Sequence, residues 1–258
     1  MKIVSYNING IRSGINKGLF HWIEACQPDI LCFQEIKAFP EQINTNILES
    51  FGYSHYWFPS KRKGYSGVGI LCKKKPNHVE YGIGLNSIDQ EGRVIRIDLK
   101  KISVINLYLP SGRNMKKRLN FKFYFMNQFF DYIKKIKKKF NNLIICGDYN
   151  ICHQKIDIYD PIKNMEISGF LPEERKWMTH FLNLGFIDSF RNSVKEANHY
   201  SWWSYSYNAR KNNKGWRIDY AMVSTSLKKQ IKNAYLLPEI KYSDHCPTVL
   251  ELEEEIIE

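Results

Sequence analysis

Polar residues that could hold a metal ion and a phosphate group follow apolar runs in this chain. The clearest case is Gly147-Asp148-Tyr149-Asn150, which comes directly after Leu143-Ile144-Ile145-Cys146. Three aliphatic residues in a row predict a buried strand, and Gly147 would let the backbone turn tightly at its end. In extended backbone Asp148 and Asn150 point to the same side, and a carboxylate beside a carboxamide suits a metal ion and a phosphate oxygen. An Asx turn that leaves the strand explains this tetrapeptide equally well.

Other predicted strands end in the same way, which favours a shared site. The polar residues at these ends are Asn7, Asn9, Glu35, Tyr108, Asp148, Asn150, Asp219 and the pair Asp244-His245. Each is weak evidence alone, since an isolated Asp-His pair usually caps a helix or lies on the surface. Carboxylates that meet at one sheet edge repel each other and need a cation, and oxygen ligands select Mg²⁺ or Mn²⁺ over zinc. A structural zinc site would need a tighter Cys/His cluster, which the sequence lacks.

The elements that must position these residues are many strands and few helices. Apolar patterning predicts strands over 2–8, 29–35, 52–59, 68–72, 93–99, 103–109, 143–146, 200–205, 216–223, 231–237 and 246–250. It predicts helices over 19–26, 116–140 and 172–184, and a half-buried strand over 93–99. No linker divides the chain, so we expect one domain over residues 1–258. The pattern is typical of an α/β sandwich, with two sheets packed face to face and helices outside.

The helix predicted over 116–140 is the longest. Its apolar stripe would consist of Leu119, Phe123, Met126, Phe130, Ile133, Ile136 and Phe140, at spacings of three and four. Lysines at 134, 135, 137, 138 and 139 crowd its last turns, where they favour the negative end of the helix dipole. Solvated helix surface is the preferred interpretation of that run, and a DNA-facing patch is the alternative.

Composition bounds the class of protein. The 258 residues carry 38 basic and 26 acidic side chains, so the net charge is 38 − 26 = +12, which suggests a polyanionic partner. No run approaches the roughly 18 apolar residues needed to span a bilayer, and the N-terminus enters a strand without a signal sequence. Cys32, Cys72 and Cys146 lie in apolar runs without any C-x-x-C pair, which indicates a reducing compartment. We therefore expect a soluble, cytoplasmic monomer with no membrane association.

With these motifs in hand, the chain resembles the exodeoxyribonuclease III / apurinic-apyrimidinic endonuclease family, within the endonuclease/exonuclease/phosphatase superfamily. The matching stretches run nearly end to end. They are Asn7-Ile8-Asn9-Gly10-Ile11-Arg12, Leu31-Cys32-Phe33-Gln34-Glu35-Ile36-Lys37, Gly67-Val68-Gly69-Ile70, Tyr108-Leu109-Pro110-Ser111-Gly112, Gly147-Asp148-Tyr149-Asn150, Ser168-Gly169-Phe170-Leu171-Pro172-Glu173-Glu174-Arg175, Trp216-Arg217-Ile218-Asp219-Tyr220 and Ser243-Asp244-His245-Cys246-Pro247.

The resemblance implies a four-layered α/β sandwich of two packed mixed β-sheets flanked by helices. It implies Mg²⁺-dependent hydrolysis of the phosphodiester 5′ to an abasic site in duplex DNA, as in base excision repair, with Mn²⁺ as a substitute ion. Members can also carry 3′→5′ exonuclease and 3′-end-cleaning activities. The expected partner is double-stranded DNA with abasic sites or blocked 3′ ends, and through it the nucleoid of a bacterial-type cell.

The resemblance also implies roles for the polar strand ends. Glu35 would be the main metal ligand, with Asn7, Asn9 and Asp244 around the ion. Asp148 would activate water or protonate the leaving oxygen, and Asn150 would help to hold the nucleophile. His245, oriented by Asp219, would bind the scissile phosphate together with Tyr108. The wider metal set would be Asn7, Asn9, Glu35, Asp148, Asn150, Asp244 and His245.

Substrate choice would rest on an apolar pocket for a flipped-out sugar that has lost its base. Trp202, Trp216 and Ile218 would line it, although two strand tryptophans are also common as plain core. DNA contacts would come from Arg12, Ser111, Asn164 and Asn208, and the basic surface from Arg12, Lys61, Lys63, Arg210 and Lys211.

Three departures from the family pattern qualify these roles. Asn9 and Ser111 are bacterial-looking choices, since eukaryotic members tend to have Asp and Asn at these positions. Ile167 stands where relatives commonly place an Asn near the DNA backbone. The chain shows no long N-terminal extension, so we do not expect an activity housed there.

Two other functions compete with a DNA-repair nuclease. A phosphoinositide or sphingolipid phosphodiesterase of the same superfamily would share the catalytic set but lack the Trp202/Trp216 pocket. A nucleic-acid-binding module with a dead site would not need Asn7, Glu35, Asp148, Asn150, Asp219 and His245, all of which are present.

Overall fold

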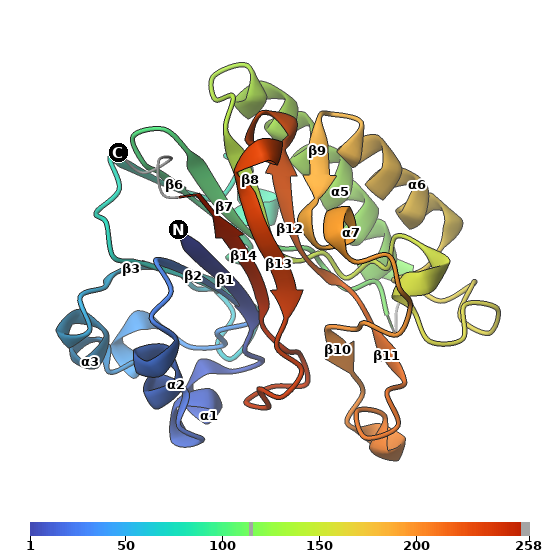
Figure 1. Ribbon diagram of the computed structural model, residues 1–258, viewed down its shortest axis with the longest axis horizontal. Helices are drawn as coiled ribbons and strands as arrows, with labels where there is room; N and C mark the ends of the chain where they lie inside the picture. The colour runs from blue at the N-terminus through green and yellow to red at the C-terminus, as the bar shows by residue number, and fades with distance from the viewer. Residues whose placement is uncertain (114–115, 254–258) are drawn as a thin grey trace.

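Two mixed six-stranded sheets form the centre of the molecule (Figure 1). The structure is a computed structural model that describes residues 1–113 and 116–253. The first sheet has the order β13-β14-β1-β2-β4-β3. Its strands are β1 (Lys2–Asn7), β2 (Ile30–Gln34), β3 (Ser54–Phe58), β4 (Val68–Cys72), β13 (Ile231–Leu236) and β14 (Thr248–Leu252).

The second sheet has the order β5-β6-β7-β8-β12-β9. Its strands are β5 (His78–Tyr81), β6 (Val94–Asp98), β7 (Ser103–Tyr108), β8 (Leu143–Asp148), β9 (Phe186–Asp188) and β12 (Asp219–Ser224). A separate hairpin pairs β10 (Trp202–Trp203) with β11 (Gly215–Trp216), and its loop projects from one end of the molecule in Figure 1.

Helices cover the outer face of each sheet. The N-terminal group α1 (Ile11–Asn16), α2 (Leu19–Cys26) and α3 (Thr45–Ser50) packs on the first sheet, while α5 (Lys116–Lys137) and α6 (Pro172–Leu182) pack on the second. The remaining helical segments are α4 (Asn86–Asp89), α7 (Ser189–Ser193) and the 3₁₀ turns η1 (Pro40–Gln42), η2 (Lys155–Asp157), η3 (Ser206–Asn208) and η4 (Thr225–Gln230). In the part of the chain that the structure describes, no helix is long and apolar enough to cross a membrane.

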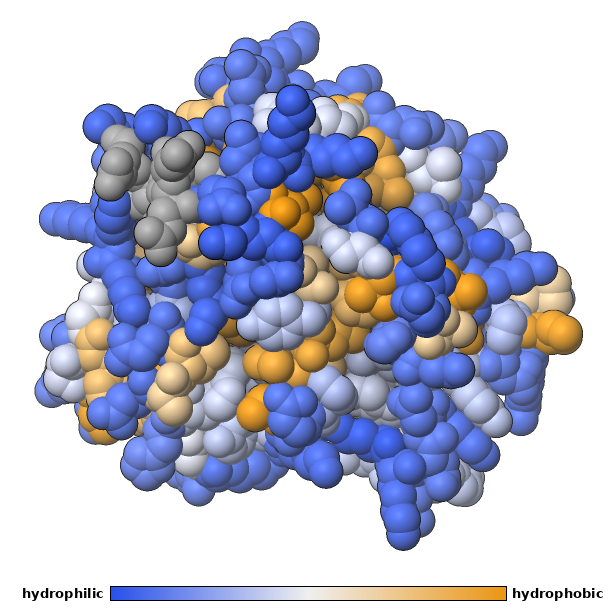
Figure 2. Space-filling model, viewed as in Figure 1, coloured by the Kyte–Doolittle hydropathy of each residue, from blue (hydrophilic) through white to orange (hydrophobic). Residues whose placement is uncertain are grey.

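Three layers of apolar packing hold this arrangement together. One core lies between the sheets and includes Cys32, Cys72 and Cys146, all of which are buried free thiols. A second lies between the second sheet and α5 and α6, and a third between the first sheet and α1 to α3. Helix, sheet, sheet and helix therefore stack in four layers, which confirms the predicted α/β sandwich. The face of the molecule in Figure 2 is mostly hydrophilic, with apolar side chains in smaller patches.

Some predicted details were wrong. Strand β6 is buried on both faces, not half-buried, because Arg96 and Asp98 pair with each other inside the protein. The apolar stripe of α5 is confirmed in part. Its predicted members Met126, Ile133 and Ile136 are buried, but Leu119, Phe123, Phe130 and Phe140 are only partly buried, and Phe125, Phe129 and Tyr132 are buried instead. Aromatic residues are frequent all around this helix, so spacing alone did not identify its buried face. The lysines that crowd its end are mostly exposed, as expected for solvated surface.

The sheet pairing explains why polar residues meet at one edge. β1 runs parallel to β2, with Asn7 opposite Gln34, and β7 runs parallel to β8, with Tyr108 opposite Asp148. The carboxyl ends of parallel strands point to the same edge, so residues that follow β1, β2, β7 and β8 gather there. Gly147 is needed inside β8 rather than at a turn: at φ 146° a Cβ would lie 1.8 Å from Leu107 O of the neighbouring strand.

Candidate active site

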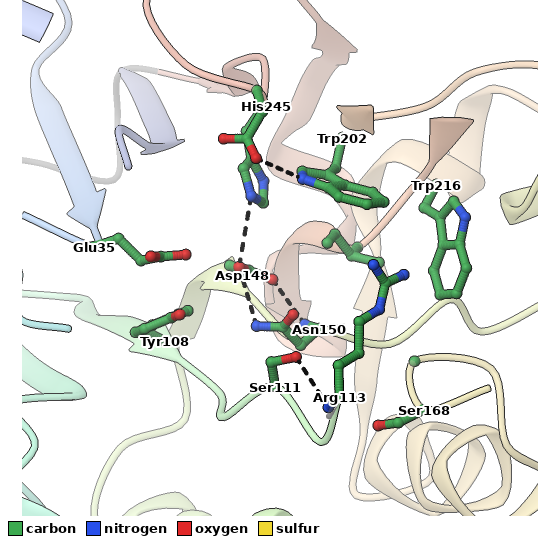
Figure 3. A pocket seen from close by; sticks show the side chains of 13 residues that line it. Glu35, Tyr108, Ser111, Arg113, Asp148, Asn150, Ser168, Trp202, Trp216 and His245 are labelled. Atoms are coloured by element: carbon green, nitrogen blue, oxygen red, sulfur yellow. Dashed lines mark hydrogen bonds and ion pairs between the residues drawn. The ribbon is translucent and has the colours of Figure 1, made fainter. Parts of the chain in front are cut away.

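A cavity of about 150 Å³ opens at the sheet edge where these strands end (Figure 3). Acidic and polar side chains form one side of it, and aromatic side chains form the other. The lining residues are Glu35, Tyr108, Ser111, Arg113, Asp148, Asn150, Ser168, Gly169, Trp202, Trp216, Ile218, Asp244 and His245. Most of the residues that the sequence singled out therefore share one cavity, although they span more than two hundred positions of the chain.

Left-handed backbone turns aim the polar side chains into the cavity. Asn9 (φ 47°), Glu35 (φ 50°) and Asn150 (φ 50°) each follow a strand and adopt positive φ. Asn tolerates this conformation, but a glutamate there is strained by about 1–2 kcal/mol. Asp148 Oδ1 accepts a hydrogen bond from the Asn150 N–H at 2.7 Å, so the Asx turn is present. The same turn brings Asn150 Nδ2 within 3.2 Å of Asp148 Oδ2, so the two side chains lie together, and their role toward a metal ion and a phosphate stays a prediction.

A carboxamide bridges the two central carboxylates. Asn7 Nδ2 donates to Glu35 Oε1 at 2.9 Å and to Asp148 Oδ2 at 2.9 Å. Its Oδ1 accepts the backbone N–H of Asn9 at 3.0 Å, so the amide side of Asn7 faces the carboxylates. Among the described residues, Glu35, Asp148 and His245 each offer one ligand atom, and these atoms lie within 4.8 Å of one another.

A buried histidine lies between two aspartates. His245 Nδ1 is 2.8 Å from Asp219 Oδ2, and His245 Nε2 is 3.9 Å from Asp148 Oδ2. Ser201 Oγ donates to Asp219 Oδ2 at 2.6 Å and accepts the backbone N–H groups of Ile218 and Asp219. The order Ser201, Asp219, His245, Asp148 is thus a continuous hydrogen-bonded and electrostatic chain. Nothing in the sequence pointed to Ser201, because one serine before an aromatic strand carries no signal.

The charges in the cavity are unevenly balanced. Burial, the Asp219 charge and the Glu35 charge together raise the pKa of Asp148 to about 8. Burial lowers the pKa of His245, but the charge and hydrogen bond of Asp219 outweigh it and raise that pKa to about 10. Burial also raises the pKa of Glu35, but Lys37 and Asn7 outweigh it and hold that pKa below its ordinary value.

These residues fit a divalent cation. Asp219, Asp148 and Asp244 all act on the single imidazole of His245, and the pKa of Asp148 is raised first by burial and then by the charges of Asp219 and Glu35, both of which a cation would offset. Glu35 stays ionised and faces the cavity, so it is the natural anchor for the ion. Carboxylate oxygens are the ligands that Mg²⁺ and Mn²⁺ prefer.

Asn9 and Asp244 lie behind this cluster. Asn9 Nδ2 donates to Asp244 Oδ1 at 2.8 Å, and Asn9 Oδ1 accepts from Lys37. Lys37 Nζ also pairs with Glu35 Oε2 at 2.8 Å. The amide oxygen of Asn9 is therefore engaged by a lysine, and the structure gives no support to direct ligation by Asn9. Asp244 Oδ2 accepts the indole N–H of Trp202 at 2.9 Å, so it links the acidic side of the cavity to the aromatic side.

Tyr108 is held at the acidic side by an arginine. Arg93 Nη1 donates to the Tyr108 carbonyl at 3.1 Å, and the Arg93 guanidinium lies 4.5 Å from the centroid of the Tyr108 ring. Burial raises the pKa of Tyr108 well above its ordinary value, and the Glu35 charge raises it further. The hydroxyl therefore stays protonated and can donate to an anion.

Trp202, Trp216 and Ile218 lie together on the aromatic side of the cavity, and their role toward a flipped-out sugar stays a prediction. The two indoles meet edge to face with centroids 6.0 Å apart. Trp216 is also packed tightly on Gly169, where a Cβ would lie 2.7 Å from the indole. Arg217, between Trp216 and Ile218, points away from the cavity and bonds buried Asp157 at 2.8 Å and Asp188 at 2.6 Å. This buried ionic network fixes the wall from behind.

A second buried ion pair ties the loop of Asn150 to the pocket floor. Lys122 Nζ donates to the Asn150 carbonyl at 2.8 Å and to Glu174 Oε1 at 2.6 Å, and both charged side chains are fully buried. Glu174 in turn accepts from Ser168 Oγ and from the backbone N–H of Gly169. Lys122 was missed because an amphipathic reading places lysine on the solvated face of a helix.

The remaining predicted DNA contacts lie outside the cavity, with the exception of Ser111. Arg12 is exposed beside a separate depression that also contacts Lys37. Asn164 bonds the carbonyls of its own loop, at Tyr159 and Asp160, and Asn208 is exposed on the β10–β11 loop. Ile167 lines a groove next to the cavity.

One candidate for the basic surface needs correction. Arg210 donates to four backbone carbonyls, those of Ser243, His245, Pro238 and Ile240, so its guanidinium braces the loop of Asp244 and His245 and does not face DNA. Lys61, Lys63 and Lys211 are exposed, as a basic surface requires.

Known proteins resemble this chain over nearly its whole length. Residues 4–245 match the model of the Endonuclease/Exonuclease/phosphatase family. The chain is 40% identical over 252 residues to an exodeoxyribonuclease of Bacillus subtilis, covering 97% of this chain and 98% of that protein. It is 38% identical over 253 residues to the DNA repair nuclease APEX1 of Danio rerio, covering 97% of this chain and 81% of that protein. The structure of the 3′ phosphatase NExo from Neisseria, bound to a product DNA hairpin, superposes with a TM-score of 0.92 at 27% identity, covering 98% of this chain and 99% of that one.

Proposed function

The chain belongs to the endonuclease/exonuclease/phosphatase family, and from its cavity we propose a Mg²⁺-dependent DNA-repair nuclease that hydrolyses the phosphodiester 5′ to an abasic site. The relatives that match over most of their length are an exodeoxyribonuclease and a DNA repair nuclease, so the enzyme is a nuclease-type hydrolase acting on DNA. One observation carries the finer proposal: a carboxylate–imidazole cluster and a pocket walled by two tryptophans share a single cavity of about 150 Å³.

The side chains around the cavity match what phosphodiester hydrolysis needs. A phosphate is bound by donors aimed at its oxygens, and protonated His245 and the Tyr108 hydroxyl are both poised to donate. Asp219, fixed by Ser201, keeps the imidazole oriented and charged. Asp148 has a pKa of about 8, so it can hold or release a proton near neutrality, as a group that activates water or protonates the leaving oxygen must. Asn150 lies beside Asp148 and can position the attacking water.

Glu35 would hold the metal ion, with Asp148 and Asn7 next to it. When bound, such an ion neutralises phosphate charge and stabilises the leaving oxygen. Lys37 pairs with Glu35 Oε2 and neutralises that oxygen. The other oxygen, Oε1, accepts from Asn7 and lies on the Asp148 side of the cluster.

The aromatic side of the cavity would select an abasic nucleotide. A nucleotide without a base is the easiest to extrude from a duplex, and a bare sugar can pack on the faces of Trp202 and Trp216. Ile218 and Gly169 close the pocket behind it, so a base has no room. This apolar wall favours a DNA nuclease over a lipid phosphodiesterase, because a lipid head group would gain no binding energy from packing on it.

A nicking assay tests the proposal directly. In Mg²⁺ the protein should cut a duplex that carries one tetrahydrofuran abasic analogue at the 5′ side of the lesion, and the same duplex without the lesion should stay intact. A parallel rate measurement on recessed 3′ ends gives the balance between endonuclease and 3′→5′ exonuclease activity. Cleavage of inositol or sphingolipid head groups, or binding without any cleavage, would point to the competing functions instead.

The Asp219–His245 pair predicts a change in pH dependence. A histidine whose pKa is about 10 is protonated through neutrality, so a rate that needs the imidazolium falls only as pH rises through that value. In Asp219→Asn the largest cause that raises the pKa is lost while burial still lowers it, so the pKa of His245 should fall below about 10. The alkaline limb of kcat/KM, measured at saturating Mg²⁺, should therefore move to lower pH. Asp160→Asn, an exposed aspartate, serves as the control, and an unmoved limb in Asp219→Asn would show that His245 acts as a neutral group.

A further inference from the structure

Arg113 lies inside the aromatic side of the cavity. Its guanidinium carbon is 4.8 Å from the centroid of the Trp202 ring and 4.5 Å from that of Trp216. In Figure 3 its side chain extends from the Ser111 loop toward both indoles. Since the two rings stand at 87° to each other, the guanidinium fills the angle between them.

Among the described residues, only the rings of Trp202 and Trp216 hold this guanidinium. Within residues 1–113 and 116–253 it makes no ion pair or hydrogen bond, and the backbone N–H of Arg113 makes a single weak bond to Ser111 Oγ at 3.4 Å. Arg93 and Arg118, its neighbours along the adjoining groove, are by contrast both paired with Glu91. Burial lowers the pKa of Arg113, as expected for a cation placed among apolar rings without an anion. The group therefore keeps its full capacity to bind a phosphate.

A sugar and the guanidinium cannot occupy this place together. Both would pack on the same faces of Trp202 and Trp216, so a sugar that binds there displaces Arg113. Displacement costs little, because cation–π contacts are weak where the cation keeps contact with solvent, and Arg113 is not closed off from solvent by the rings. The displaced cation then lies at the mouth of a site that receives the phosphates of the extruded nucleotide.

We propose that Arg113 closes the sugar pocket of the free protein by stacking on Trp202 and Trp216, and that it moves to a DNA phosphate when an abasic sugar takes its place. The second half rests on the proposed function; the first half does not. Arg113 then acts as a specificity-determining residue, because only a nucleotide that enters the pocket gains the extra phosphate contact. A base-bearing nucleotide that stays in the helix leaves Arg113 on the indoles.

The salt dependence of DNA binding tests whether Arg113 moves from the indoles to a phosphate. With Mg²⁺ present and the scissile linkage replaced by an uncleavable methylene phosphonate, affinity is measured over a range of salt for an abasic and an intact duplex. On the abasic duplex the slope of log affinity against log salt should be shallower by about 0.9 in Arg113→Ala than in wild type, since one phosphate contact is lost. On the intact duplex the two slopes should be equal, and Arg113→Lys should keep the wild-type slope on both. Lys139→Ala, an exposed lysine just beyond the C-terminal end of α5, is the matched control and should change neither slope.

The alternatives give different results. Equal slopes of wild type and Arg113→Ala on the abasic duplex would show that the cation stays on the indoles. An equal reduction on both duplexes would show an ordinary phosphate contact that does not depend on the pocket. Either result overturns the proposed move, whereas a wild-type protein without any preference for abasic DNA contradicts the proposed function.

The free protein allows a separate test of the closed pocket. If Arg113 covers the two indoles, Arg113→Ala should increase quenching of tryptophan fluorescence by acrylamide in the absence of DNA, and Lys139→Ala should not. Unchanged quenching in Arg113→Ala would show that the guanidinium does not cover the pocket, and would overturn the first half of the proposal whatever the substrate is.

Discussion

Glu35→Ala is expected to lower kcat/KM on abasic duplex by at least about 1,000-fold at micromolar Mg²⁺, because a metal ion that neutralises the phosphate is worth several kcal/mol. The pKa values of two cavity carboxylates, Glu35 and Asp244, are held below their ordinary values, and of these two Glu35 lies in the ligand cluster with Asp148 and His245. Asp148 has a pKa of about 8, so its carboxyl group must lose a proton to bind the ion, and it is a weaker ligand than Glu35. Loss of Glu35 thus removes the anchor and leaves Lys37 without its partner.

The measurement is a titration of the nicking rate with Mg²⁺ for wild type, Glu35→Ala and Glu41→Ala. Glu41 is an exposed carboxylate on the same connection after β2, so its removal tests for a general charge effect. Part of the Glu35→Ala loss should be recovered at high Mg²⁺, because Asp148 remains to bind the ion weakly. Full activity of Glu35→Ala at micromolar Mg²⁺, or of wild type in EDTA, would contradict a metal site at Glu35.

The layers of the fold could be predicted because local patterns agree with the tertiary structure. Runs such as Ile30–Gln34 and Leu143–Asp148 are buried on both faces and read as continuous apolar segments. Short elements gave weaker signals. Strand β5 (His78–Tyr81) is exposed at both ends and polar, and it exists because β6 offers it an edge. Pairing with another strand decides such cases, and the pattern of the strand's own residues does not contain that information.

The site could be predicted where unusual polar residues lie at strand ends. The buried residues that hold these side chains in place could not be predicted. Glu35, Asp148 and His245 stood out because charged residues next to the ends of buried strands need an explanation. Ser201 and Lys122 gave no such signal, since their importance lies in partners at distant positions, Asp219 and Glu174. Arg113 was also missed, because what makes it notable is that, within the part of the chain that the structure describes, its guanidinium contacts the two indoles and no anion.

Trp216→Ala is expected to cost about 2–4 kcal/mol of transition-state stabilisation on the abasic substrate, by analogy with emptying a packed aromatic site. Cleavage at nucleotides that keep their base should fall less, or rise, because the wall that excludes a base is opened. The quantity to measure is the ratio of kcat/KM for abasic over base-retaining duplex at fixed salt and Mg²⁺. Circular dichroism is needed alongside, since Trp216 is also buried against Gly169 and its loss destabilises the fold.

Trp203→Ala is the matched control that separates selectivity from stability. Trp203 is the neighbour of Trp202 in β10 and is buried in a different cluster, with Tyr200, Ala209 and Cys246, on the side of the strand away from the cavity. Its removal should lower the free energy of unfolding as Trp216→Ala does, yet leave the ratio of specificity constants unchanged, because no cavity wall is lost. If Trp216→Ala lowers activity on both substrates by the same factor, as Trp203→Ala should, then Trp216 serves only as core and the abasic pocket must lie elsewhere.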